Sequence, residues 1–351
     1  MKEMGSEFWS IDTKKTEKQL FLSGRTALEY IIRNIISEKD IRSVLLPSWC
    51  CHTMIEPFLR HQISVRFYDV YFDERRGLCA DIPTALESEI FYYMTYFGST
   101  YLGGMDEKYI RENWFCIIAD DTHSWLGEKR YEKYCLIPDY VYASYRKWSG
   151  IYGIALAKKM NGKFSVIVKK KSSEEYTSLR IHANQLKQRY LEGENIDKLQ
   201  FLKLYAKAEE LLELDYVNYE PSLLAVEQLL NIDCQGMKNK RYKNAKVLIN
   251  ELSGVDKIRI IFPDLIEGEI PLFVPILVNE SDRDELRKFL IDNKIYCPVH
   301  WPLSDYHRGI SNRAELIYKR ELSLLCDQRY DVEDMKQIAG KIKEFYARRR
   351  M

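Results

Sequence analysis

The sequence predicts an α/β fold: a mainly parallel sheet covered by helices, followed by a smaller α+β lobe. Short apolar runs alternate with helical patterns from about residue 25 to 155, which is typical of a parallel sheet with crossover helices. Residues 160–232 are mostly helical and charged, and a second alternation follows. A chain of 351 residues suits two domains. We place a large domain at 20–235 and a small one at 236–351, with residues 1–19 free to pack on the latter.

The first alternation begins with a helical pattern at residues 26–39, followed by a short apolar run that stops at Pro47. Further strands are predicted by apolar or aromatic runs at residues 64–70, 89–98, 114–120, 139–145 and 153–159. Ligands bind at the carboxyl ends of the strands in such sheets. The residues that end these runs are therefore the first candidates for a functional site.

The C-terminal lobe is predicted from a shorter series of elements. A helix ends at Gly254, and a strand covers residues 269–278. A helix with Ser281 as its N-cap precedes two short strands, and Asp331 caps a long final helix. The short strands are expected at residues 295–299 and 322–326.

The composition argues against several classes of protein. The 53 basic and 52 acidic side chains give a net charge of +1, which disfavours nucleic acid as a partner. No apolar run approaches the roughly 20 residues of a membrane helix, and residues 1–15 lack the apolar core of a signal peptide. The 8 cysteines are scattered without a C-x-x-C pair, which predicts reduced thiols, no metal site and a cytoplasmic location.

Two clusters at the predicted strand and helix ends could contact a ligand. The backbone N–H groups at the helix start formed by Ser23, Gly24, Arg25 and Thr26 are suited to hold a phosphate. The alternative is a Ser-capped helix with a solvated arginine. Trp49, just after a strand, is a candidate platform for stacking on a ring, or else a core residue.

Two further clusters carry titratable groups. Asp120 ends an apolar run and His123 follows three places later; a buried carboxylate needs a cationic or N–H partner, and a helix cap is the alternative. Ser144 and Lys147 are three apart at another strand end, where they are either a hydroxyl beside a reactive amine or a polar loop. Together the four clusters are the parts needed to hold pyridoxal 5′-phosphate: a phosphate site, an acid for the pyridine nitrogen and a lysine for a Schiff base.

The same segments carry a resemblance to a known family. The chain resembles the fold-type I pyridoxal-phosphate enzymes, and among them the DegT/StrS-type sugar aminotransferases, from about residue 20 to 348. The segment "SGRTAL" is similar to the phosphate segment of that family, "ADDTHS" to its Glu-Asp-x-x-His/Gln segment, and "ASYRKW" to the segment with the Schiff-base lysine, here Lys147. The resemblance implies that Asp120 binds the pyridine nitrogen, that His123 lies near the phenolic oxygen, and that Ser144 contacts the phosphate.

The sequence also departs from the family pattern. The family has a serine five residues before the lysine, whereas here Ser144 stands three before Lys147, as in other fold-type I aminotransferases. Ala119 stands where the family often has Glu, and residues 181–190 do not match the segment that a neighbouring subunit usually contributes. The chain thus resembles a divergent branch of the family.

The resemblance implies an aminotransferase that moves an amino group from an amino acid, expected to be glutamate, to a keto acceptor, expected to be a keto sugar on a nucleotide. Lys147 would then move the proton between the donor's α-carbon and the cofactor. Two other functions stay open: another pyridoxal-phosphate enzyme, such as a lyase, desulfurase or decarboxylase, for which Cys50 and Cys51 supply thiols, and a non-catalytic binding or regulatory protein.

The resemblance also implies a homodimer whose active sites lie at the interface. The 25 tyrosines and 14 phenylalanines support this expectation, because a monomer would expose part of an aromatic cluster near the site. That cluster consists of Tyr92, Tyr93, Tyr96 and Phe97. One of Arg180, Lys187 and Arg189 is expected to approach the cofactor phosphate or substrate of the neighbouring subunit.

Overall fold

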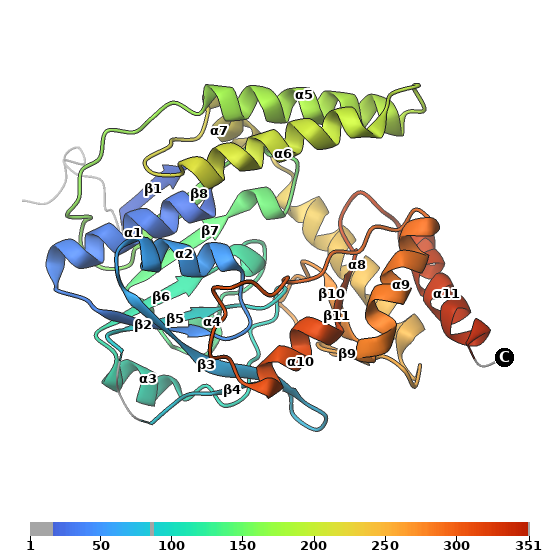
Figure 1. Cartoon of the computed structure of the whole chain (residues 1–351), viewed down its shortest axis with the longest axis horizontal. Helices are drawn as coiled ribbons and strands as arrows, with labels where there is room; N and C mark the ends of the chain where they lie inside the picture. The colour runs from blue at the N-terminus through green and yellow to red at the C-terminus, as the bar shows by residue number, and fades with distance from the viewer. Residues whose placement is uncertain (1–16, 85–87, 350–351) are drawn as a thin grey trace, which may run out of the picture.

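The computed structural model describes residues 17–84 and 88–349, and Figure 1 shows their arrangement. A sheet of eight strands has the order β1-β8-β7-β6-β5-β2-β3-β4. Its strands are β1 (Glu17–Phe21), β2 (Ser43–Pro47), β3 (Ser64–Asp73), β4 (Gly77–Asp81), β5 (Ile90–Met94), β6 (Cys116–Asp120), β7 (Tyr140–Ser144) and β8 (Ala155–Lys159). The five strands from β7 to β3 run parallel, and β1, β4 and β8 run antiparallel to their neighbours. The predicted mainly parallel sheet is confirmed.

Helices cover the sheet on both sides in Figure 1, with α1 and α2 above it and α3 below. These are α1 (Gly24–Glu38), α2 (His52–Arg60), α3 (Glu107–Asn113) and the short α4 (Arg130–Lys133). The side chain of Ser23 accepts the N–H of Thr26 at 3.1 Å, which explains why α1 begins where it does. Most apolar side chains of α1, including Ile31 and Ile35, are buried in the core of the large domain, whereas Ile36 is exposed.

A helical hairpin follows the sheet, as the charged helical pattern predicts. The helices α5 (Glu174–Leu191) and α6 (Lys198–Leu214) lie along the top of the molecule in Figure 1, with α7 (Leu223–Leu230) behind them. Residues 17–19, which the sequence left free to pack on the C-terminal lobe, belong to β1 and pair with β8 of the large sheet. Residues 1–16 lie outside the described part of the chain.

The C-terminal lobe contains a three-stranded sheet in the order β11-β10-β9. Its elements are α8 (Cys234–Leu252), β9 (Arg259–Ile260), β10 (Val274–Leu277), α9 (Glu280–Asp292), α10 (Asn312–Arg320), β11 (Glu321–Leu324) and α11 (Val332–Arg348). A separate apolar cluster, drawn from residue 245 onward, forms its core. The domain boundary at residue 235 stays a prediction, which this separate core and the start of α8 support.

Some C-terminal details differ from the expectation. Residues 295–299 form no strand, because Pro298 has no N–H to donate to a neighbouring strand. Its carbonyl accepts the N–H of Ser323 at 3.0 Å. Helix α9 begins after Asn279, so Ser281 lies within its first turn. Asp331 caps α11 as predicted, accepting the N–H groups of Glu333 and Asp334.

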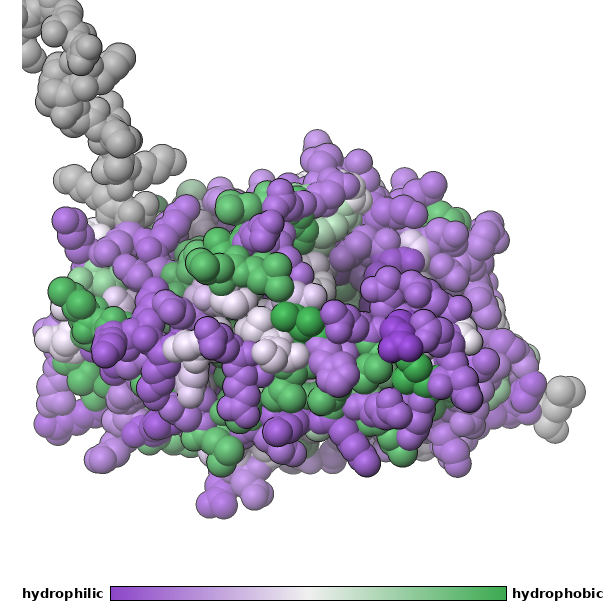
Figure 2. Space-filling model, turned by 90° about the horizontal axis from the view of Figure 1, so that it is seen from above, coloured by the Kyte–Doolittle hydropathy of each residue, from purple (hydrophilic) through white to green (hydrophobic). Residues whose placement is uncertain are grey.

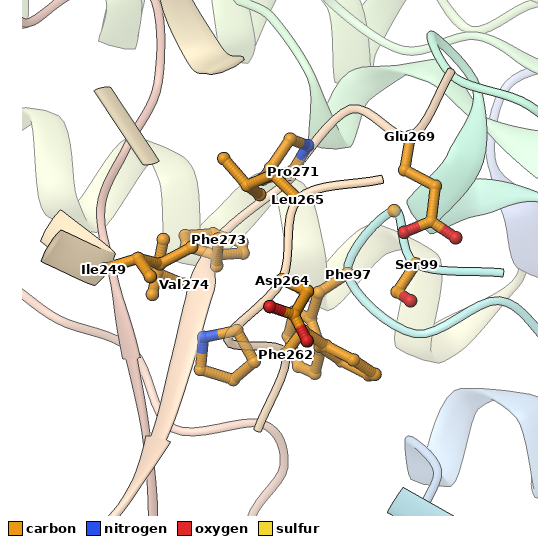
Figure 3. A pocket seen from close by; sticks show the side chains of 12 residues that line it. Phe97, Ser99, Ile249, Phe262, Asp264, Leu265, Glu269, Pro271, Phe273 and Val274 are labelled. Carbon is orange, nitrogen blue, oxygen red and sulfur yellow. The ribbon is translucent and has the colours of Figure 1, made fainter. Parts of the chain in front are cut away.

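The two lobes meet beside the strand ends of the large sheet. Figure 3 shows Phe97 from the loop after β5 beside Phe262 of the C-terminal lobe, and Ser99 and Val274 line the same cavity. The cavity among them measures about 20 Å³, which is room for about one water molecule. Gly98 there has φ +94°, and a Cβ on it would lie 1.9 Å from the carbonyl oxygen of Ile270. This contact is therefore a tight packing joint between the lobes.

The described residues include no cluster of potential metal ligands, and none of the described helices is long and apolar enough to cross a membrane. All 8 cysteines are free thiols, as predicted.

Candidate active site

The register of the parallel strands brings the predicted residues together. Asp120 at the end of β6 pairs with Met94 of β5 and with Tyr142 of β7. Residues paired in parallel strands point to the same face of the sheet. On that face the start of α1 packs against the end of β7, because a Cβ on Gly24 would lie 3.1 Å from the Cβ of Ser144. Segments about 120 residues apart in the sequence thus form one site.

Asp120 is a buried carboxylate, with 1% of its surface exposed. Its Oδ2 accepts the hydroxyls of Tyr92 at 3.0 Å and Tyr142 at 2.8 Å, and its Oδ1 accepts the N–H of Thr122 at 2.8 Å. Burial raises the pKa of Asp120, and these hydrogen bonds oppose that shift. No cationic side chain of the described residues lies within ion-pairing distance of it.

Asp121 belongs to a different environment. Its Oδ2 accepts the hydroxyl of Tyr131 at 3.1 Å, and its Oδ1 has no partner. Burial raises the pKa of Asp121 to about 7, which the nearby Lys129 partly opposes. Of the two adjacent acids, only Asp120 shares the face of the sheet on which Tyr142, Ser144 and Gly24 meet.

His123 is buried and neutral. Its Nδ1 accepts the N–H of Phe97 at 3.3 Å, so its proton resides on Nε2. The ring stacks on Trp301 with 5.6 Å between centroids. Burial lowers the pKa of His123 well below its ordinary value, and His300 and Lys147 lower it further.

Lys147 ends a short 3-10 turn, Tyr145–Lys147, that directly follows β7. Its amine forms no hydrogen bond or ion pair within the described residues, and the side chain is exposed to a cavity of about 840 Å³. Surrounding protein atoms lower the pKa of Lys147, and the charge of Arg146 lowers it further, although Cys51, Glu209 and Asp120 oppose this. An unpaired lysine with a lowered pKa is suited to act as a nucleophile or a base.

The start of α1 keeps two N–H groups free. The hydroxyls of Ser23 and Thr26 bond to each other at 2.9 Å, so both serve the helix cap. The N–H groups of Gly24 and Arg25 have no hydrogen-bond partner among the described residues, and Gly24 packs against Ser144, whose hydroxyl makes no hydrogen bond there. The side chain of Arg25 turns instead to α6, where it pairs with Glu213 at 2.5 Å.

Trp49 has none of its surface exposed, so it offers no face to a ligand in this conformation. Its ring stacks on Tyr96 at 4.8 Å, and its Nε1 donates to the carbonyl of His300 at 2.6 Å. This is the core packing that the sequence also allowed. The aromatic cluster around it is buried within a single chain, which contradicts the expected exposed aromatic surface: Tyr92, Tyr93, Tyr96 and Phe97 are each at most 2% exposed.

Cys51 lies near the Lys147 amine as the N-cap of α2. Burial opposes its ionisation, but contacts with His52 at 3.9 Å and Thr53 at 3.2 Å and the charge of Lys147 outweigh burial. The pKa of Cys51 therefore falls below its ordinary value. Cys50 is buried, and burial raises its pKa.

The C-terminal lobe adds residues that the sequence did not predict for the site. His300 lies 6.0 Å from His123 between ring centroids, and its Nδ1 bonds to the hydroxyl of Ser323 at 2.8 Å. Ser323 in turn donates to Glu321 at 2.5 Å, and Glu321 also accepts the N–H of His300 at 2.6 Å. The sequence signals for His300 were its place with a tryptophan between two prolines, in "CPVHWPL", and the resemblance of that segment to the substrate lobe of the family.

Comparisons with known proteins were made on sequence and on structure. No protein-family model matches the sequence, and no curated protein matches it. The structure is similar to Helicobacter pylori PseC, an aminotransferase involved in the biosynthesis of pseudoaminic acid, with a TM-score of 0.62, 13% identity and coverage of 93% of this chain and 86% of that chain. It is also similar to S. venezuelae DesV in complex with a ketimine intermediate, with a TM-score of 0.60, 16% identity and coverage of 93% of this chain and 84% of that chain. A third similar structure is a DegT DnrJ EryC1 StrS aminotransferase from Brucella abortus, with a TM-score of 0.58, 16% identity and coverage of 93% of this chain and 85% of that chain.

These structural similarities cover nearly the whole chain at low sequence identity, and they establish the fold. The chain has the fold of the fold-type I pyridoxal-phosphate aminotransferases, as the sequence predicted.

The buried Glu321 generates a prediction about stability. Burial raises the pKa of Glu321 to about 8, against the opposing effects of Ser323, the His300 N–H and Arg283. The folded protein therefore holds a proton that the unfolded chain releases near the ordinary carboxyl pKa, so its stability falls as pH rises from about 4.5 to about 8. Glu321→Gln cannot titrate and should escape this loss.

Urea unfolding of both proteins at pH 5 and pH 9 measures this effect. The wild type should lose stability relative to Glu321→Gln over this range, by about 1.4 kcal/mol for each unit of the pKa difference. A stability difference between the two proteins that is the same at both pH values would contradict the assignment.

Proposed function

We propose that the chain is a pyridoxal-phosphate-dependent aminotransferase. The observation that carries the proposal is the juxtaposition of the unpaired Lys147 with the buried Asp120 and the free N–H groups at the start of α1, on one edge of the large sheet. The fold that the chain shares with solved aminotransferases supports it.

The residues fit the cofactor. Asp120 is buried without a cationic partner, and a carboxylate accepts more hydrogen bonds than the three that Asp120 accepts here, so it can still bind a protonated pyridine nitrogen. The N–H groups of Gly24 and Arg25 and the hydroxyl of Ser144 would hold the phosphate. His123 would donate from Nε2 to the phenolic oxygen. When bound, the cofactor supplies an electron sink for negative charge at the substrate's α-carbon.

Asp120 and Lys147 would control two different protons in the reaction. Asp120, held by the hydroxyls of Tyr92 and Tyr142, keeps the proton on the ring nitrogen. The lowered pKa of Lys147 increases the neutral fraction of its amine, and that neutral amine would remove the proton from the α-carbon of the donor and return it to a carbon of the cofactor. The neutral His123 adds no charge that would repel Lys147.

Glutamate is the proposed amino donor, and a keto sugar on a nucleotide is the proposed acceptor. The names of the structural neighbours support a sugar acceptor, because PseC is described as an enzyme of pseudoaminic acid biosynthesis. The free cysteines support the cytoplasmic location expected from the sequence.

A second candidate function rests on Cys51. A partly exposed thiol with a lowered pKa near Lys147 is compatible with a desulfurase or another pyridoxal-phosphate enzyme that uses a thiol. Transamination and thiol chemistry differ in one observable. Only an aminotransferase would retain its activity in Cys51→Ser.

The first prediction under this proposal concerns Lys147. The purified protein with pyridoxal 5′-phosphate should show a visible absorption band that glutamate abolishes. Borohydride reduction should attach the cofactor permanently to Lys147, and peptide mapping identifies the labelled residue. The absence of a band, or a label on another lysine, would refute the proposal.

The second prediction separates Asp120 from Asp121. Asp120→Asn should keep the cofactor but lose activity by about a hundredfold or more, because a neutral amide does not hold the ring nitrogen protonated. Asp121→Asn is the matched control, since its neighbour Tyr131 lies outside the site. Single-turnover kinetics with glutamate, followed by absorbance, measures both. Equal losses in the two variants would count against the assigned roles.

We further propose that the chain forms a homodimer. Helices α5–α7 carry exposed leucines, and the face that Figure 2 shows from above has apolar patches among its polar side chains. The most exposed of these leucines are Leu191, Leu214, Leu223 and Leu230.

The third prediction is that light scattering at micromolar concentration gives about twice the 41.7 kDa chain mass. The double variant Leu223→Gln, Leu230→Gln should dissociate more readily, because burial of these side chains would favour association. A wild-type protein that stays monomeric while binding the cofactor would rule out the dimer.

A further inference from the structure

Three side chains of the C-terminal lobe form a continuous chain of hydrogen bonds that ends at the candidate site. Glu321 and Ser323 belong to β11, and they point to the same side of the strand because side chains alternate along it. The hydroxyl of Ser323 contacts Oε1 of Glu321 at 2.5 Å and Nδ1 of His300 at 2.8 Å. The position of a proton at one end of this chain therefore affects the other end.

Glu321 is the buried end of the chain, with none of its surface exposed. Its Oε2 accepts the N–H of His300 at 2.6 Å, so the proton of the neutral acid resides on Oε1, where the hydroxyl of Ser323 is its acceptor. Burial raises the pKa of Glu321 to about 8, against the opposing effects of Ser323, the His300 N–H and Arg283. At neutral pH the side chain is therefore mostly the neutral acid.

Two other groups of the C-terminal lobe face Glu321. Arg283 of α9, which also donates to the carbonyl of Tyr318 at 3.1 Å, keeps its charge. Burial raises the pKa of Cys297 to about 12, with a further contribution from Glu321, so this thiol stays neutral. Of these three groups, only Glu321 changes its charge between pH 6 and pH 10.

His300 is the end of the chain that reaches the site. Burial lowers the pKa of His300 to about 3, and the charge of Lys147 lowers it further, so the ring is neutral and carries a single proton. Nδ1 is bonded to Ser323, whereas Nε2 forms no hydrogen bond within residues 17–84 and 88–349. The ring packs edge-on against His123, with 6.0 Å between centroids, and it is partly exposed. Nε2 is therefore the nitrogen that is left for a ligand.

The chain of hydrogen bonds has two complete arrangements, because a hydroxyl has one proton to donate. When Glu321 is neutral, it donates to Ser323 and Ser323 donates to Nδ1 of His300, so the ring carries its proton on Nε2. When Glu321 is ionised, Ser323 donates to Oε1 and must accept from Nδ1, so Nε2 has no proton. Each state of the acid thus requires a different tautomer of the ring.

We propose that Glu321 is a positioning residue that acts through Ser323 to set the tautomer of His300, so that Nε2 is a hydrogen-bond donor below a threshold pH and an acceptor above it. On ionisation, the proton of Glu321 passes to Ser323, the proton of Ser323 passes to Nδ1, and the proton on Nε2 leaves to solvent. The partly exposed ring thus connects a fully buried acid to water. The tautomer change does not depend on the cofactor, whereas its effect on the reaction rests on the proposed function.

A purely structural role is the alternative. Glu321 and Ser323 also brace the loop that carries His300, since the carboxylate holds its N–H and the Ser323 N–H bonds to the carbonyl of Pro298 at 3.0 Å. A brace would hold the ring in place at every pH, and it would not change which nitrogen carries the proton. The two roles therefore differ in a quantity that can be measured.

Nuclear magnetic resonance of the cofactor-loaded protein with ¹⁵N-labelled histidine tests the proposal. The sequence has 6 histidines, and His300→Gln identifies the signals of this ring by their loss. A ring nitrogen with a proton and one without are distinct, so the spectrum reports the tautomer directly. We expect the proton on Nε2 at pH 6 and on Nδ1 at pH 10, with a midpoint near the pKa of Glu321, about 8.

Three variants assign this step in the titration. Glu321→Gln should keep the proton on Nε2 at every pH, because its amide donates to Ser323 as the neutral acid does. Ser323→Ala removes the hydroxyl between the two groups and should abolish the step. Glu269→Gln is the matched control: Glu269 is also buried and accepts an N–H, that of Thr100 at 2.6 Å, but it has no bond to His300, so the step should remain.

The activity gives a second measurement. Under the proposed function, the single-turnover rate with glutamate in the wild type, divided by that in Glu321→Gln, should fall by about tenfold as pH rises through 8, the effect of one lost hydrogen bond. The ratio removes the contribution of Lys147, which titrates in both proteins. A constant ratio would overturn the role in the reaction.

The spectra decide the inference itself. A tautomer that is the same at pH 6 and pH 10 in the wild type would overturn it, as would a step that persists in Glu321→Gln or in Ser323→Ala, or one that disappears in Glu269→Gln. A protein that shows no cofactor band but has the step, and loses it in Glu321→Gln, would refute the proposed function and support this inference.

Discussion

The site depends on one constraint, the parallel register of β5, β6 and β7. That register places Asp120 between Met94 and Tyr142, so the hydroxyls of Tyr92 and Tyr142 reach the same carboxylate oxygen. A shift of one residue would turn Asp120 to the opposite face and put Asp121 in its place. The packing of Gly24 against Ser144 then fixes the start of α1 over the same edge. Every group that we assign to the cofactor is positioned by this edge of the sheet.

Burial determines the charges at this edge. It raises the pKa of Asp120 and lowers that of His123, and the protein atoms around the Lys147 amine, whose side chain is exposed to the cavity, lower its pKa as well, so each group is pushed toward its neutral form. A cationic ring nitrogen would restore the charge of Asp120, whereas Lys147 needs its neutral form to act as a base. The shift toward the neutral form therefore has opposite consequences for Asp120 and Lys147. It favours the reactive form of the lysine and leaves the acid in need of a partner.

The C-terminal lobe completes the site. It brings His300 to His123 through the contacts of Ser323 and Glu321, and its Arg241 and Arg329 line the cavity beside Lys147. The close approach of Gly98 to Ile270 shows how tightly the two lobes are joined. Residues of both lobes thus surround Lys147.

The sequence by itself determined the fold and the residues at the strand ends. Local patterns suffice for this, because apolar runs, caps such as Ser23 and Asp331, and the residues that follow each run depend on near neighbours in the chain. Only the tertiary structure decided the rest. It buried Trp49 and the tyrosines of β5, turned Arg25 toward α6, and brought His300, Arg241 and Arg329 to Lys147. These contacts join residues tens to hundreds of positions apart, and no local pattern records which side chains such a distance brings together.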